Sequence, residues 1–549
     1  MQNPAFYLKP NIVMEPLWNQ WYAWSYLIAP STASMYVLNW HLKLLESFAE
    51  APEVHVQALQ NPALIGGPFL NYPAERVADV RNLILTTRKN QEHLIALANA
   101  VRALEFVLEQ EGTGGSMEAV YSKVPEPLRG MVELVYDIRN NPVIRWIEPL
   151  LYASRFYRRE SQSLSLWEMK SDERPMVFSS PRFSEAGQLR LEMPFDDDRV
   201  DEIVALKRFP QSKAYIHDLF GARAGDELLD SMLTTEPPRK AIGVSPGGVR
   251  ILYLGHACVL IQSEHTSVLC DPLLSYEYPS ALKRYTYQDL PGQIDYALVT
   301  HNHQDHFHLE ALLQLRQRIG QLVVPRSDGG SIQDPSLRLV LENTGFHNAR
   351  DIAEFETIHF KDGSITAIPF LGEHGDLNIR SKVAYLIEIA GTRIVCAADS
   401  NNLEPEMYRH LARVYGEIDI LFIGLECEGA PLSWAYGPLM PKLLPRKADQ
   451  SRRLNGSNCE RALGVVEQLR PKKVFIYAMG EEPWLSFIMG RQDSSESVPA
   501  QNARKFVTEC ARMGVPTERL FAQKEIHPHD LQDTLSMKQT MEIQTSIGA

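Results

Sequence analysis

The stretch Thr300-His301-Asn302-His303-Gln304-Asp305-His306 decides how the rest of the chain is interpreted. It follows the apolar run 294–299, which is typical of a short buried strand. Two histidines at i and i+2 can bind one metal ion from a turn, and the Asp and His after them can reach a second position beside it. Imidazole and carboxylate ligands suit zinc, iron or manganese. The pattern therefore predicts a metal site where a strand ends.

Composition excludes several classes of partner. The chain has 549 residues and a formal net charge of -13, so few positive charges are available to neutralise nucleic-acid phosphates or an anionic membrane. No apolar run reaches transmembrane length, and the N-terminus lacks a basic and apolar leader. The six cysteines are scattered without a C-x-x-C motif, which favours buried thiols in a reducing compartment. We expect a cytoplasmic protein that binds neither nucleic acid nor membrane.

The chain divides into three predicted regions. Residues 1–245 carry no ligand cluster and are expected to form a mixed α+β domain that covers the active site or mediates dimerisation. Within it, the spacing of Trp18, Trp21 and Trp24 favours one face of a helix, packed in a core or subunit interface. Pro and Gly density over 234–248 marks the boundary. Residues 249–525 are expected to be catalytic, and 526–549 a polar tail.

Short strands interleaved with helices from residue 249 onward predict an αββα sandwich with ligands at strand ends. Four motifs occur there in order: Leu254-Gly255-His256-Ala257, Asp271-Pro272, the 301–306 cluster and Ala398-Asp399. Together they resemble the metallo-β-lactamase fold, in its lactonase-like branch. That resemblance implies an α/β sandwich with the metal site at one edge.

Two departures from the ordinary zinc hydrolases of this fold concern the metal ligands. The middle histidine position is Glu373-His374, and the place of the last histidine is occupied by 477–480, Tyr-Ala-Met-Gly. Composition alone would choose His374. With Glu373 as the ligand instead, three histidines and three carboxylates would surround the site, and such anionic oxygen ligation favours a redox-active di-iron centre.

This ligand set resembles the di-iron β-hydroxylases of chloramphenicol-type antibiotic biosynthesis, which have the lactamase fold and a long N-terminal domain. The resemblance implies an iron- and dioxygen-dependent monooxygenase that hydroxylates the β-carbon of an aminoacyl group held as a thioester on a nonribosomal peptide synthetase carrier (thiolation) domain. It implies that one non-haem iron binds His301, His303 and Glu373. The other would bind Asp305 and His306, with Asp399 and an oxo or hydroxo group as bridges.

The predicted catalytic residues are Glu373 and Glu426, the latter placed to orient the substrate amino group or to support the ligands. His256 and Asp271 are expected to be structural partners of the backbone, and His308 to lie on the surface.

Three further expectations concern the substrate and the partners. Trp434 and Tyr436 either line an aromatic substrate pocket or pack in the fold. The basic stretch 442–453 either docks an acidic carrier domain or is a solvated loop. No reductase or flavin motif occurs, so an external electron donor is expected, alongside a homodimer.

Two alternative functions stay open at this point. The first is a zinc or manganese hydrolase of the same fold that attacks a lactone or phosphoester through metal-bound hydroxide. The second is a catalytically idle scaffold in which the first half mediates association.

Overall fold

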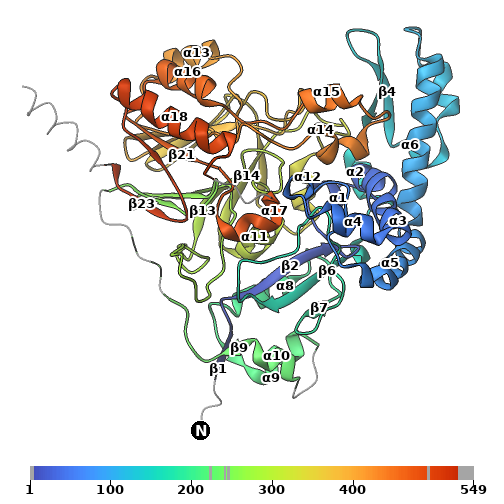
Figure 1. Cartoon of the computed structure of the whole chain (residues 1–549), viewed down its shortest axis with the longest axis horizontal. Helices are drawn as coiled ribbons and strands as arrows, with labels where there is room; N and C mark the ends of the chain where they lie inside the picture. Colours follow the sequence, from blue (N-terminus) through green and yellow to red (C-terminus); the bar gives the residue numbers. More distant parts are fainter. Residues whose placement is uncertain are drawn as a thin grey trace, which may run out of the picture.

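Two seven-stranded sheets lie face to face in the C-terminal half of this computed structural model, which describes residues 5–221, 226–239, 241, 243, 248–490 and 495–528 (Figure 1). The first sheet has the order β15 (Ala349–Ile352), β14 (Ile319–Pro325), β13 (Ile294–Leu298), β12 (Ser267–Cys270), β11 (Val259–Gln262), β10 (Arg250–Tyr253) and β23 (Lys524–Ile526). The second has the order β16 (Thr357–Phe360), β17 (Gly363–Ile368), β18 (Ala384–Ile389), β19 (Thr392–Cys396), β20 (Ile420–Gly424), β21 (Lys473–Tyr477) and β22 (Thr517–Arg519).

Helices cover both outer faces of the sandwich. Helices α13 (Glu406–Tyr415), α16 (Cys459–Leu469) and α18 (Val498–Arg512) pack on the second sheet, and α11 (Leu309–Leu315) and α12 (Leu337–Glu342) on the first (Figure 1). A separate apolar cluster fills the space between the sheets. Strands buried on both faces read as continuous apolar runs rather than as alternating ones. The predicted αββα metallo-β-lactamase sandwich is confirmed. The remaining helices of this half are short: α14 (Leu432–Ala435), α15 (Arg446–Ser451) and α17 (Ser486–Met489).

The N-terminal half mixes helices with small sheets, as expected. Its helices are α1 (Ser25–Ile28), α2 (Pro30–Tyr36), α3 (Leu42–Glu50), α4 (Pro52–Ala58), α5 (Val77–Asn90), α6 (Glu92–Glu111), α7 (Glu148–Tyr152), α8 (Asp198–Ala205), α9 (Lys213–Leu219) and α10 (Glu227–Ser231), with a π-helical turn at Val37–His41. Its strands are β1 (Ala5–Leu8), β2 (Ile12–Trp18), β3 (Trp21–Tyr22), β4 (Val132–Tyr136), β5 (Pro142–Trp146), β6 (Gln162–Glu168), β7 (Leu189–Leu191), β8 (Gln211–Ser212) and β9 (Leu233–Thr234).

The helix predicted for the tryptophan-rich segment is wrong. Trp18 ends β2, Trp21 begins β3, and the two pair across a tight turn in which Asn19 and Gln20 both have positive φ. Trp24 then precedes α1. Residues spaced by three lie on one face only when the backbone between them is helical. The positive φ angles of Asn19 and Gln20 are incompatible with a right-handed helix here.

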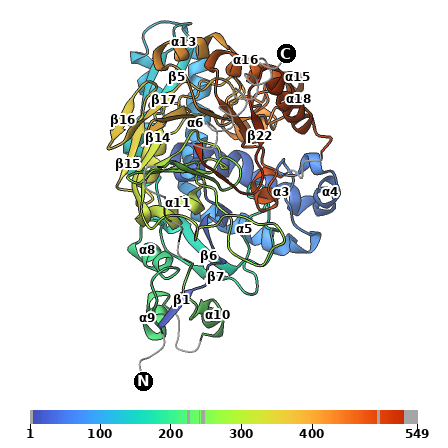
Figure 2. The same cartoon turned by 90° about the vertical axis from the view of Figure 1, so that its left-hand side faces the viewer.

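The two halves share one continuous core. The apolar cluster that contains the N-terminal helices also contains the outer face of the first sheet and α11 (Figure 2). The predicted boundary at 234–248 lies partly outside the described residues, between the end of β9 and the start of β10. The predicted tail, 526–549, begins on the last residue of β23, and 529–549 lie outside the described residues. No helix within the described ranges is long and apolar enough to cross a bilayer.

A buried charge network ties the halves together next to the 301–306 loop. The Arg174 guanidinium lies 2.8 Å from Glu15 of β2 and 2.7 Å from Glu310 of α11. Arg182 contacts the other oxygen of Glu15 at 3.0 Å. All four side chains are at most 4% exposed. Charges buried to this extent persist only when they are paired.

We expect Arg174→Met to lower the free energy of unfolding by about 3–5 kcal/mol, because it leaves two buried carboxylates short of a partner. The free energy of the first urea-induced transition is the measurement. Arg155→Met is the control, since its pair with Glu126 is solvent-exposed and such pairs contribute under about 1 kcal/mol. Similar losses in both variants would contradict the expectation.

The pH dependence of stability should include one acidic group from this network. Burial raises the pKa of Glu15, but Arg182 and Arg174 outweigh it and lower the value from 4.5 to about 2. The folded pKa is depressed, so the stabilisation is complete above pH 4.5 and is lost as the pH falls toward 2. In Glu15→Gln, the slope of unfolding free energy against pH in that window should fall by up to about 1.4 kcal/mol per pH unit. An unchanged slope would exclude Glu15 as the titrating group.

Candidate metal centre

The predicted site residues follow five strands that end at one edge of the sandwich. His256 follows β10, Asp271 follows β12 and the 300–306 loop follows β13. Glu373 comes after β17, and Asp399 after β19. The pairings make these strands run in one direction within each sheet. Loops at the carboxyl ends of such strands meet at one edge, which gathers ligands that are far apart in the sequence.

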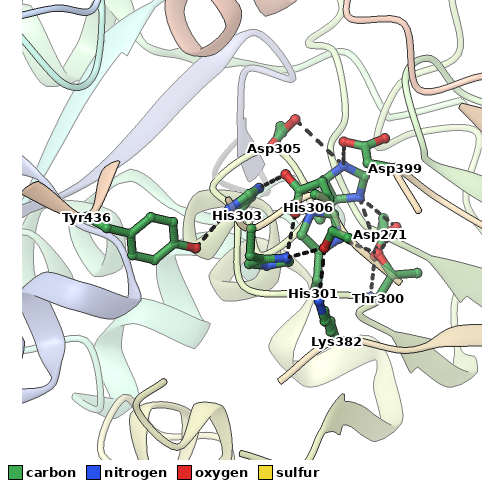
Figure 3. A network of polar contacts seen from close by, with 12 residues as sticks. Asp271, Thr300, His301, His303, Asp305, His306, Lys382, Asp399 and Tyr436 are labelled. Atoms are coloured by element: carbon green, nitrogen blue, oxygen red, sulfur yellow. Dashed lines mark hydrogen bonds and ion pairs between the residues drawn. The ribbon is translucent and has the colours of Figure 1, made fainter. Parts of the chain in front are cut away.

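Asp271 fixes the conformation of the histidine loop (Figure 3). Its carboxylate accepts hydrogen bonds from the backbone N–H and the hydroxyl of Thr300, both at 2.7 Å. The same carboxylate lies 2.8 Å from Nδ1 of His306. Nδ1–H then donates to Asp271, which leaves the Nε2 lone pair of His306 free to bind a metal ion.

Glu373 reaches the histidines across the site. One of its oxygens lies 2.7 Å from Nδ1 of His303, and the other lies 3.9 Å from Nε2 of His301. His374 contacts Glu373 at 2.7 Å and its Nε2 has no hydrogen-bond partner in the described part of the chain. An extended segment would have pointed the two neighbours in opposite directions, but Glu373 has a φ of 67° and both side chains are buried at the site.

Asp399 approaches the same cluster from the second sheet. Its Oδ2 is 3.1 Å from Nε2 of His306, whereas Asp305 is 3.6 Å from that nitrogen. A Cβ on Gly424 would lie 2.8 Å from the carbonyl oxygen of Ala398 and 3.1 Å from Asp399 Oδ1. Glycine at the end of β20 therefore leaves room for the segment after β19, which carries Asp399.

The donor set fits two metal ions. Ligand atoms converge in three groups: His301, His303 and Glu373; His301, His306 and Asp399; and His256, Asp305 and His306. His301 Nε2 and Asp399 Oδ1 are buried and lack hydrogen-bond partners among the described residues. A buried polar atom without a hydrogen-bond partner destabilises the protein unless an ion binds it. The predicted ligands are thus brought together, with Glu373 rather than His374 in these groups.

The electrostatics of the site favour the ionised forms of Glu373 and Asp305. The histidines around Glu373, chiefly His303 and then His374, overcome its burial and hold its pKa well below the usual range. His306 and His256 do the same for Asp305. Burial and the neighbouring imidazoles lower the pKa of His301, which favours the neutral, metal-binding form.

The positions or contacts of His308 and His256 differ from those expected. His308 is 2% exposed and hydrogen-bonds Tyr22 through Nε2 at 2.7 Å, so its predicted surface position is wrong. His256 is expected to be a structural partner of the backbone. In the structure its own backbone N–H donates to the Glu482 carboxylate, and its side-chain Nε2 lies 3.2 Å from Asp305. His256 follows β10, and the loop that carries Asp305 follows β13 of the same sheet. This shared position at strand ends could have indicated the contact between His256 and Asp305. Half-buried Glu426 follows β20 on this edge and belongs to none of the three groups.

A cavity of about 870 Å³ lies between the N-terminal helices and the lactamase half. Its walls include Met35, Trp40, Trp146, Leu439 and Tyr436, and the Tyr436 hydroxyl is 3.1 Å from Nε2 of His303 (Figure 3). Lys43, Arg102 and Lys442 also line it and are exposed. Of the two aromatic residues considered for a pocket, Tyr436 lines this cavity, whereas Trp434 packs over Gly67 instead.

The comparisons with known proteins agree with this geometry. Residues 7–237 match the family described as diiron non-heme beta-hydroxylase N-terminal domain, and 250–430 match the beta-lactamase superfamily domain. The chain is 37% identical over 533 residues to the 4-amino-L-phenylalanyl-[CmlP-peptidyl-carrier-protein] 3-hydroxylase of Streptomyces venezuelae, covering 94% of this chain and 99% of that protein. The crystal structure of CmlA, a diiron beta-hydroxylase from Streptomyces venezuelae, superposes with a TM-score of 0.89 at 35% identity, covering 96% and 100% of the two chains.

A relative this similar over nearly the whole of both chains shows the family, and the αββα fold, the long N-terminal region and the mixed histidine and carboxylate site all agree with it. The chain belongs to the diiron non-heme beta-hydroxylase family.

Proposed function

We propose that this di-iron oxygenase hydroxylates the β-carbon of an aminoacyl group held as a thioester on a nonribosomal peptide synthetase carrier domain. One atom of dioxygen enters the C–H bond and the other leaves as water, with an electron pair and two protons drawn from an external donor. The observation that carries the proposal is the 870 Å³ cavity whose Tyr436 wall contacts His303. The relative from Streptomyces venezuelae, named for a carrier-bound amino acid, supports the substrate class.

The proposed ligands of the first iron are His301, His303 and Glu373, which form one of the three convergent groups. Asp305 and His306 would hold the second iron. Asp399 would serve both sites, a role supported by its place in one convergent group with His301 and His306.

Bound iron supplies the redox chemistry that activates dioxygen. The protein contributes position and the exclusion of water. His301 and His306 are fully buried and Glu373 is 4% exposed. Contacts with the surrounding protein therefore hold these side chains in place and keep water away from them. We propose that Glu426, at the edge of the site, orients the substrate amino group.

The cavity suits a long, mostly apolar arm with a charged far end. Its inner walls are aromatic and aliphatic, and its volume lies within the range of ligand pockets, about 300–1,000 Å³. Phe106 and Leu443, which also line it, are 65% and 75% exposed. Three cations, Lys43, Arg102 and Lys442, also line the cavity, and so do Glu105 and Glu109, of which Glu109 pairs with Lys442. We propose that Lys43 and Arg102 contact the phosphate of a pantetheine arm and the acidic face of its carrier. Of the predicted docking stretch 442–453, Lys442 and Leu443 line the cavity.

We propose that the electrons come from a separate donor and that the chain forms a homodimer. The oligomeric state requires sedimentation or light scattering.

We expect Glu373→Ala to retain at most about one iron per chain and to lose hydroxylation, because a direct ligand is removed. His374→Ala should lower iron affinity by no more than about 10–100-fold, the usual cost of losing a partner that only supports a ligand. Elemental analysis with optical spectroscopy of the oxidised protein measures both. The reverse ranking would assign the ligand to His374. Bound zinc with esterase activity and no oxygen uptake would exclude the oxygenase.

The form of the substrate gives a second test. In a single turnover, reduced enzyme should add one oxygen atom to an aminoacyl-carrier domain and none to the free amino acid, because only the linked form fills the cavity. Mass spectrometry of the carrier and of the small-molecule fraction measures both products. Equal turnover of the free amino acid would remove the carrier domain from the proposal.

A further inference from the structure

A second cavity, of about 540 Å³, lies between the N-terminal region and the lactamase half. Its walls include the chain that follows α8 and the segment that precedes β13, with Tyr7, Pro238 and Tyr287 among the apolar and aromatic surfaces. The volume falls within the range of small-molecule pockets, about 300–1,000 Å³. It shares no lining residue with the cavity at Tyr436, and none of the candidate metal ligands lines it. It is therefore separate from the site described above.

Two cations line this second cavity without a carboxylate partner in the described part of the chain. The Lys207 ammonium donates to the Ile12 carbonyl and to the side-chain oxygen of Gln314, both at 2.7 Å. An ammonium has three N–H groups, so one is left for a ligand. Arg318 is 8% exposed and donates to three backbone carbonyls of the segment 287–291. Its Nε has no hydrogen-bond partner among the described residues.

The surroundings of Lys207 do not neutralise its charge. The rings of Tyr276 and Tyr287 lie 5.1 and 5.8 Å from its Nζ. The carboxylate of Glu310 raises the pKa of Lys207, but that carboxylate is already paired with Arg174. Burial outweighs it and lowers the pKa of Lys207 from 10.5 to about 7. A lysine in this environment is stabilised in its charged form by any anion that reaches it.

The other charges at the second cavity make it more positive. Arg208 also lines it, and burial together with this neighbouring cation lowers the pKa of Arg318 to about 10. Among the described lining residues the acid is Glu277, which is paired with Arg239 at 2.6 Å. The chain as a whole has a net charge of -13, so overall composition does not account for this group of cations. Cations that converge on an apolar pocket suit a negatively charged ligand.

We propose that the second cavity binds a small organic anion, a carboxylate or a phosphate ester with an apolar body about the size of one ring. The oxygens of the anion accept hydrogen bonds from the Lys207 ammonium and the Arg318 guanidinium, and the body packs against Tyr7 and Tyr287. This site depends neither on the di-iron chemistry nor on the carrier-bound substrate, because it shares no residue with either.

The experiment is a calorimetric titration of the iron-loaded full chain at pH 7 and constant ionic strength. The probes are phenyl phosphate, benzoate and the neutral benzyl alcohol. We expect saturable binding of at least one anion and none of benzyl alcohol, and the tighter anion identifies the charged group. Lys207→Met should weaken that binding by at least about tenfold, because it removes a charge-assisted hydrogen bond.

Arg208→Met decides the question if Lys207→Met does not fold. Its guanidinium makes one backbone contact, to Gly292 at 3.2 Å, so its removal should leave the fold intact. We expect about threefold weaker binding of the anion, since a half-buried cation contributes less than a buried one.

Lys213→Met is the matched control, because it removes the same unit of charge from the N-terminal region. Its ammonium is 47% exposed, pairs with Asp230 and does not line the cavity. Its affinity should stay within about twofold of wild type, because solvent and salt screen the charge. The proposal is overturned if neither anion binds saturably, if benzyl alcohol binds as tightly as the anions, or if Lys213→Met weakens binding as much as Lys207→Met. Binding at the iron centre would leave all three variants at wild-type affinity, which also overturns it.

The same titration at higher pH tests Lys207 directly. A phosphate monoester, with a second pKa of about 6, stays a dianion between about pH 7 and 9, whereas Lys207 loses its charge over this window. The affinity for phenyl phosphate should therefore fall by up to about tenfold per pH unit in wild type, the slope for one proton. In Lys207→Met the slope should disappear. An equal slope in both proteins would remove Lys207 from the site and overturn the proposal.

Discussion

The metal site depends on one buried carboxylate. Asp271 accepts two hydrogen bonds from Thr300 and contacts Nδ1 of His306, and its side chain is only 1% exposed. If the buried carboxylate of Asp271 lost one of these partners, no water would replace it, and the loss would cost free energy. The partners of Asp271 are therefore held in place. The loop after β13 is therefore held at both of its ends by the residue that follows the neighbouring strand, and the histidines inherit that fixed geometry.

Buried contacts from the N-terminal region also hold the histidine loop in place. Glu310 lies in the first turn of α11, the helix after the histidine loop, and it is paired with Arg174, Tyr22 and Tyr276 in the interior. A shared apolar core surrounds this network, so the loop cannot move without disturbing both halves. A lactamase sheet alone would present its ligands to solvent, whereas here the ligands lie beneath a second layer of protein. Such enclosure suits chemistry in which a reactive oxidant must meet only its substrate.

Ligand chemistry and enclosure together distinguish this site from the hydrolases of the same fold. In the proposed ligand set, Glu373 takes the place of a neutral imidazole, and Ala478 stands where a further histidine is expected, with its N–H donating to the carbonyl of His256. The site gains negative charge and loses a nitrogen ligand. Hard, anionic oxygen donors stabilise the higher oxidation states of iron. The di-iron family assignment and the carboxylate-rich shell therefore agree.

The sequence by itself determined the sandwich, the order of its motifs and the composition of the ligand set, because strand patterns and the histidine cluster are local signals. The pattern of residues left Glu373 and His374 as alternative ligands. The tertiary structure brings both side chains to the site through the positive φ of Glu373, and it places Glu373 in a convergent group with His301 and His303. It also placed Trp18 and Trp21 in a hairpin, His308 in the interior and Tyr436 against His303. Each of these outcomes depends on left-handed backbone or on contacts between residues more than a hundred positions apart, and neither follows from the periodicity of a segment.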